Sequence, residues 1–203
     1  ERALAHKTSL RSTMDVVEAF RETDNETPVV LMGYANPIVR MGYKACAENA
    51  SVAGVDGLLT VDLPPEEAVD LNTELKKVGI ENIFLIAPTT TAARCEAVVK
   101  QAGGFIYYVS LKGVTGAGHL DVAEVQSKVS MIRGLTDLPI CVGFGIKDAE
   151  SAKAVTANAD GAVVGSLLVA EMGRLADKPV DEIASAVADL IRPLRTGLDE
   201  LGR

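Results

Sequence analysis

The chain has 203 residues, of which 48% are apolar and 24% are charged. This composition is typical of a folded domain with a sizeable core and excludes a largely disordered chain. The formal net charge of −8 argues against binding to nucleic-acid backbones, and no apolar run reaches the ~20 residues of a membrane span.

Six short apolar runs predict β-strands, and several are continuous Val/Ile/Leu-rich stretches rather than alternating patterns. Continuous runs are typical of strands buried on both faces of a parallel sheet. In chain order, the runs are Pro28–Ala35, Val55–Asp62, Asn82–Ala87, Phe105–Ser110, Pro139–Gly145 and Gly161–Ser166.

Amphipathic stretches of helical period lie between these runs. The Pro64-Pro65 pair is expected to open one helix, with Glu66 and Glu67 in its first turn. Asp148 is expected to cap another. Further helices are expected at Ser12–Arg21, Tyr43–Ala53, Thr91–Ala102, after Asp121, at Leu167–Arg174 and at Asp181–Ile191, where Pro193 should kink or end the last one.

The alternation of strand and helix indicates βα units around a parallel sheet, either a doubly wound sheet or a (β/α)₈ barrel. No G-x-G-x-x-G follows the first strand, which weakens the dinucleotide-binding alternative. The glycines gather instead at the ends of the last two strands, where barrels commonly bind phosphate. We therefore predict an α/β fold, a (β/α)₈ TIM barrel forming a single domain over residues 1–203, whose first two βα units would lie upstream of Glu1.

Gly145 and the Gly165-Ser166 pair stand at these two strand ends. Glycine lets backbone N–H groups approach an anion, Ser166 adds a hydroxyl donor, and a helix that begins just after adds the positive end of its dipole. Each glycine alone could simply turn the chain. Together they predict a phosphate site.

Residues Leu111–His119 form a Gly-rich loop after the fourth predicted strand, with Gly116 and the hydroxyl of Thr115 at its centre. Such a loop is either a lid that closes over substrate or a plain surface loop. His119 is interpreted as a solvated loop residue rather than a base.

Four apolar or aromatic residues on or beside different strands could form a pocket or could be ordinary core: Tyr34, Leu59, Phe105 and Tyr107. Asp62 ends a strand at the same mouth and could bind substrate, anchor the lid or take part in catalysis. The three cysteines form no C-x-x-C pair and are interpreted as thiols in a reducing cytosol, with no metal site expected.

Six segments of the chain form distinctive motifs: VLMGYANPI (Val30–Ile38), GVDGLLTVDLPPEEA (Gly54–Ala68), IFLIAPTTT (Ile83–Thr91), FIYYVSLKGVTGAG (Phe105–Gly118), GFGI (Gly143–Ile146) and GAVVGSLLV (Gly161–Val169). In order and with compatible spacing over essentially the whole chain, these motifs resemble the tryptophan synthase α subunit family. The resemblance implies retro-aldol cleavage of indole-3-glycerol phosphate to indole and glyceraldehyde 3-phosphate. The family's catalytic Glu and Asp would lie upstream of Glu1, so no catalytic residue is assigned here and the chain alone is expected to be inactive.

The resemblance also implies roles for individual residues. Phosphate binding would fall to Gly116, Gly145, Gly165 and Ser166, and the indole pocket to Tyr34, Leu59, Phe105 and Tyr107. Thr115 would help the lid to close, and Asp62 and Pro64 would meet the β subunit of a cytoplasmic α2β2 complex. Pyridoxal phosphate would belong to that partner, so this chain is expected to need no cofactor.

Two alternatives stay open at this point. One is another phosphate-binding barrel enzyme, although the YANPI, DLPPEE and GVTGA motifs argue against it. The other is a non-catalytic module that binds the β subunit.

Overall fold

The computed structural model describes residues 2–109, 122–143, 146 and 148–200. The chain forms two compact units, one of Glu1–Leu85 with Ala93–Ile106 and the other of Ile86–Ala92 with Tyr107–Arg203. Each unit is described separately, and the expectation of a single domain stays a prediction.

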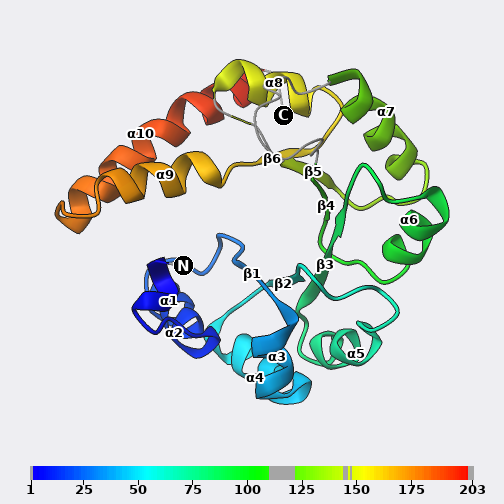
Figure 1. Ribbon diagram of the computed structural model, residues 1–203, viewed down its shortest axis with the longest axis horizontal. Coiled ribbons are helices and arrows are strands. Elements are labelled where there is room, and N and C mark those ends of the chain that lie inside the picture. The colour runs from blue at the N-terminus through cyan, green and yellow to red at the C-terminus, as the bar shows by residue number, and fades with distance from the viewer. Residues whose placement is uncertain (1, 110–121, 144–145, 147, 201–203) are drawn as a thin grey trace. The chain divides into compact units, whose positions relative to one another are not determined.

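The first half of the chain alternates helices with short parallel strands, as predicted. Strand β1 pairs with β2 and β2 with β3, with Leu31 opposite Leu58 and Leu58 opposite Asn82. Helices α2, α4 and α5 follow one another along one side of these strands (Figure 1). The elements are α1 (Arg2–Ala5), α2 (Leu10–Arg21), β1 (Val30–Gly33), α3 (Ala35–Met41), α4 (Tyr43–Ala53), β2 (Gly57–Thr60), α5 (Val69–Lys77), β3 (Glu81–Ile86) and α6 (Ala92–Val99).

Helix α5 begins later than the sequence predicted. Its buried face contains Leu71 and Leu75, which are fully buried. The Pro64-Pro65 pair and the residues after it form a separate turn instead, in which the amide of Ala68 donates to the carbonyl of Pro64 at 3.0 Å. The physical reason is that a proline disfavours helical backbone in the residue before it, here another proline.

One carboxylate ties the beginnings of β1 and β2 together. Asp56 Oδ2 accepts hydrogen bonds from the amide of Val29 at 2.7 Å and from Nη2 of Arg21 at 2.6 Å. Arg21, the last residue of α2, also donates to the carbonyls of Gly54 at 2.9 Å and Thr27 at 2.8 Å. A helix end and two strand starts are therefore fixed by a single cluster of charge-assisted hydrogen bonds.

The second unit continues the alternation, and β5 pairs in parallel with β6. The predicted cap of α8 is confirmed, because the Asp148 side chain accepts from the amide of Ser151 and the Ser151 hydroxyl completes a capping box. The elements are β4 (Ile106–Val109), α7 (Val122–Arg133), β5 (Ile140–Gly143), α8 (Ala149–Thr156), β6 (Gly161–Val163), α9 (Ser166–Arg174) and α10 (Val180–Asp199).

All six predicted strands are present in the described part of the chain, and all but β3 are shorter than predicted. The shortening has a local cause at two sites. Tyr34 is already the N-cap residue of α3, and Gly165 is the N-cap residue of α9, so neither residue extends its strand.

Of the two outcomes expected at Pro193, a kink or an end of the helix, the end is wrong, because α10 continues through Pro193 to Asp199. A proline inside a helix removes one backbone hydrogen bond. Packing against α8 offsets this loss: an added Cβ on Gly197 would lie 2.9 Å from the Ala149 Cβ, so glycine permits close approach. Lys153 of α8 also pairs with Glu200 at 2.6 Å. Helix α10 lies beside α8 and α9 (Figure 1).

A second carboxylate cluster ties the beginnings of β5 and β6. Asp160 Oδ2 accepts from the amide of Ile140 at 2.8 Å and from Nη2 of Arg133 at 2.7 Å. Arg133 ends α7 and also donates to the carbonyl of Asn158 at 3.3 Å. No helix among the described residues is both long and apolar enough to cross a membrane.

Replacing Asp56 with Ala should destabilise the fold, because the amide of Val29 and the Arg21 guanidinium lose their common acceptor. We expect the free energy of unfolding to fall by about 1–2 kcal/mol, a modest value because the Asp56 side chain is 54% exposed. Urea unfolding followed by circular dichroism measures the change. Asp15→Ala, at an exposed position of α2, is the control, and equal losses in both variants would contradict the prediction.

Candidate active site

The end of β1 places two large side chains in solvent. Met32 is 59% exposed and Tyr34, which follows the strand as the N-cap residue of α3, is 64% exposed. Residues two apart along a strand point to the same face. Leu59 of β2 is the register partner of Met32 and is only 2% exposed. Of the predicted pocket residues, Leu59 therefore lies beside Met32 on the neighbouring strand, and Tyr34 follows Met32 just after β1 ends.

Asp62 has a defined partner. Its Oδ1 accepts a hydrogen bond of 2.7 Å from the amide of Ala35, the first residue of α3. This bond satisfies an amide in the first turn of a helix, where no carbonyl of the helix is available. Asp62 therefore connects the segment after β2 to the end of β1. A role toward substrate, lid or partner stays a prediction.

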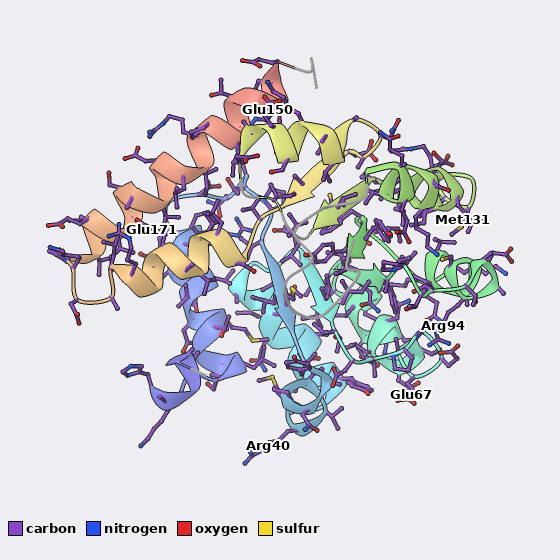
Figure 2. All side chains as sticks on the ribbon, turned by 45° about the horizontal axis from the view of Figure 1, so that its top comes forward. Arg40, Glu67, Arg94, Met131, Glu150 and Glu171 are labelled. Carbon is purple, nitrogen blue, oxygen red and sulfur yellow. The ribbon has the colours of Figure 1, made fainter. Side chains whose placement is uncertain are left out.

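The segment that follows Asp62 is held on the body of the first unit. The side-chain amide of Gln101 donates to the carbonyl of Pro65 at 2.7 Å, and the Arg94 guanidinium binds both carboxylate oxygens of Glu66, at 3.0 and 3.3 Å. Glu67 and Arg94, labelled in Figure 2, extend into solvent from this region. Pro64 lies half-buried at the start of the turn.

Tyr107 of β4 lies across the backbone of Gly143 in β5. A Cβ added at Gly143 would lie 2.7 Å from the Tyr107 Cζ, closer than side chains approach one another, and would also meet the Tyr107 hydroxyl. Burial, and secondarily the nearby Cys141, raises the pKa of the Tyr107 phenol above its usual value. The phenol is therefore neutral at physiological pH. Phe105, two residues earlier, is half-buried.

The predicted phosphate site is described only at its last strand end. Gly165 and Ser166 are exposed, and they are the N-cap and the first residue of α9. No side chain caps this helix, so its first amides have no partner from a cap. Gly116, Thr115 and Gly145 lie outside the described residues.

Sequence reasoning missed one candidate residue, Met32, and one contact, between Tyr107 and Gly143. Met32 stands two residues before Tyr34 and could have been found by strand alternation. The contact of the Tyr107 ring with Gly143 could not have been found in this way, because it requires that β4 and β5, which are far apart in sequence, lie side by side. Among the described residues, no group of three or more His, Cys, Asp or Glu side chains is placed to hold a metal ion.

Comparison with known proteins identifies a consistent set of relatives. A sequence model of the family described as "Tryptophan synthase alpha chain" matches residues 1–195. The tryptophan synthase alpha chain of Marinobacter nauticus is 52% identical over 201 residues, covering 99% of this chain and 74% of that protein. The alpha chain of Thioalkalivibrio sulfidiphilus is 54% identical over 201 residues, covering 98% of this chain and 74% of that protein.

Solved structures give the same result. The tryptophan synthase alpha chain of Legionella pneumophila has a TM-score of 0.86 at 39% identity, covering 99% of this chain and 74% of that one. A chain of the tryptophan synthase complex from Pyrococcus furiosus has a TM-score of 0.83 at 31% identity, covering 96% of this chain and 76% of that one.

Gly143→Ala should destabilise the protein, because the new methyl group would collide with the Tyr107 ring. Overpacking of this kind costs about 1–3 kcal/mol. Gly33→Ala is the matched control, since an added Cβ there would meet nothing within 4 Å. Chemical unfolding measures both variants.

The double variant Gly143→Ala/Tyr107→Ala should recover part of the loss, measured against Tyr107→Ala alone. If Gly143→Ala costs as much without the ring as with it, the Tyr107 contact is not the cause.

Proposed function

Because the chain belongs to the tryptophan synthase alpha chain family, we propose that its phosphate site consists of Gly116, Gly145, Gly165 and Ser166. The known role of this family is retro-aldol cleavage of indole-3-glycerol phosphate to indole and glyceraldehyde 3-phosphate in tryptophan biosynthesis. Its α/β fold, of the (β/α)₈ TIM-barrel type, is confirmed by the likeness to solved alpha chains. A different phosphate-binding barrel enzyme is no longer a competing interpretation.

The single observation that supports the phosphate site best is the open space above Gly165. An added Cβ on Gly165 would meet nothing within 4 Å. Packing within the described residues therefore does not require glycine there. Close approach of a ligand to the backbone at the start of α9 would require it, and the helix dipole favours an anion at that point.

The apolar part of the substrate would lie against Tyr34, Leu59, Phe105 and Tyr107. Aromatic and aliphatic side chains suit an indole ring, because they bury it without requiring hydrogen-bond partners. Tyr107 is neutral at physiological pH, so it adds no charge beside the ring. These residues would bind and orient the substrate and exclude water, whereas the proton transfers of the retro-aldol step require general acid and base groups.

The proposed partner is the β subunit of tryptophan synthase, in an α2β2 assembly. The similar solved structures include the tryptophan synthase complex and its "a2b2" form from Pyrococcus furiosus. The interface would include Asp62 and Pro64, with Thr115 closing the lid loop. The segment after β2 suits this role, since the Glu66–Arg94 and Pro65–Gln101 contacts hold it firmly while Glu67 stays exposed.

Pyridoxal phosphate would belong to the β partner, and this chain would need no cofactor of its own. A cytoplasmic location is proposed with it. The three cysteines form no disulfide in the structure, which is compatible with a reducing compartment. A purely non-catalytic module that docks on the β subunit is the remaining alternative, and it predicts partner binding without turnover.

Ser166→Ala should weaken binding of glycerol 3-phosphate. Losing one hydrogen bond to a charged group costs about 1.5–3 kcal/mol, or at least tenfold in affinity. Isothermal titration calorimetry on the full chain measures the change. Ser185→Ala, at an exposed position of α10, is the control. Unchanged affinity in Ser166→Ala would remove this residue from the proposed site.

Glu67→Lys should weaken association with the β subunit, because it reverses an exposed charge in the proposed interface. It leaves the Asp62–Ala35 hydrogen bond in place, so folding should be unaffected. Analytical ultracentrifugation of the chain with the β subunit measures association. Glu26→Lys, before the start of β1, is the matched control. Equal association by both variants would place the interface elsewhere.

A further inference from the structure

The two faces of strands β4 and β5 differ in burial. Ile106 and Tyr108 of β4 and Ile140 and Val142 of β5 are almost completely buried on one face. Their neighbours alternate with them and point to the other face. Tyr107 and Cys141 on that face are only half-buried, although Gly143 is buried, and all three residues of β6 are half-buried. The second unit therefore has one face that is closed and one that is open.

Cys141 lies at the centre of the open face, with a glycine on either side. Gly143 is two residues along the same strand, and an added Cβ there would meet the Tyr107 ring. Gly161 is the register partner of Cys141 on β6, and an added Cβ there would lie 3.0 Å from the Cys141 Sγ. A side chain at either glycine would therefore point toward the open face.

Tyr107 and Cys141 are therefore neighbours on this face. Tyr107 covers the space above Gly143, and the Cys141 thiol lies beside Gly161, where β6 has no side chain. Burial, and secondarily Asp160, raises the pKa of the Cys141 thiol, so the group is protonated and neutral at physiological pH. A neutral thiol packs as a small, polarizable apolar group and contacts aromatic rings favourably.

We propose that Cys141 is a specificity-determining residue, which contacts the deep edge of the substrate's indole ring and limits the size of that ring. The inference rests on the proposed function, which puts the ring against Tyr107. Strand β6 runs from Gly161 beside the thiol to Val163, and Gly165 of the proposed phosphate site follows shortly after it, at most about 13 Å from Gly161 for four residues of extended chain. A ligand with an aromatic ring at one end and a phosphate at the other suits this spacing.

The first test changes the size of the side chain at position 141. Cys141→Leu should weaken binding of indole-3-glycerol phosphate at least tenfold, the scale on which one or two added carbons are discriminated in an apolar pocket. Binding of glycerol 3-phosphate should be unchanged. Cys141→Ala should instead raise the relative affinity for substrate that carries a methyl group on the benzo ring. Calorimetry on the full chain measures all four affinities.

Gly161→Ala provides a matched variant. Its new methyl group would press on the Cys141 Sγ from the side of β6 and reduce the space that the thiol leaves for the ring. The variant should therefore reproduce the selective loss of the indole ligand. Retained glycerol 3-phosphate binding in Cys141→Leu and Gly161→Ala shows that the fold is intact in each.

A second test uses the unmodified chain. Cys46 and Cys95 are completely buried, so N-ethylmaleimide should alkylate Cys141 first. Indole-3-glycerol phosphate should slow this reaction at least tenfold, and glycerol 3-phosphate should leave it almost unchanged. Peptide mass spectrometry locates the adduct, with Cys46 and Cys95 as internal controls.

The outcomes separate this inference from the proposed function. If the unmodified chain binds glycerol 3-phosphate and the indole ligand but neither ligand protects Cys141, and Cys141→Leu binds normally, the inference is overturned and the proposed function stands. If the unmodified chain binds neither ligand, the proposed function fails and the inference fails with it.

Discussion

A carboxylate placed one residue before a strand is the constraint on which each unit depends. Asp56 accepts from the amide of Val29, just before β1, and from Arg21, which ends the helix before that strand. Asp160 in the other unit accepts from the first amide of β5 and from Arg133, which ends the helix before β5. In both, the arginine also donates to the carbonyl two residues before the aspartate. Helix end, strand start and the next strand start are thereby fixed together. A parallel sheet needs such a device, because its neighbouring strands share no tight turn.

Concentrating polar anchors at the strand beginnings leaves the other ends available for binding. In barrels, the amino ends of the strands serve stability and the carboxyl ends carry the active site. The contrast is visible in the side chains: Arg21 directs its donors at carbonyls and one carboxylate, whereas Gly165 has open space above its backbone. Asp62 is intermediate, since it anchors Ala35 from an exposed position at a strand's carboxyl end.

Sequence reasoning succeeded where the determinants are local. Tyr43–Ala53 was predicted to the residue, and the Asp148 cap follows from a short-range hydrogen bond. Helix α3 was not predicted, because seven residues with a single buried side chain, Ile38, show no periodicity. The Arg21–Asp56 pair spans 35 positions and no sequence pattern reveals it.

The candidate site divides in the same way. The strand-end glycines and the apolar strand residues could be identified from composition and position, and the family resemblance assigned them roles. Helix α10 misled the sequence analysis, since the effect of Pro193 depends on packing against Ala149 and Lys153 of α8. Such tertiary compensation cannot be predicted from the residues adjacent to Pro193 in the sequence.

The contact between Tyr107 and Gly143 also restricts how this sequence can change over time. A larger residue at position 143 is tolerated only after the side chain at position 107 has become smaller, because the ring occupies the space that a new side chain would need. In the reverse order, the larger residue at position 143 arises while the Tyr107 ring is still present. The two side chains collide, and selection would remove this destabilised variant. Substitutions at these two positions are therefore expected to accumulate in one direction, so the same pair of changes is open to evolution by one path and closed by the other.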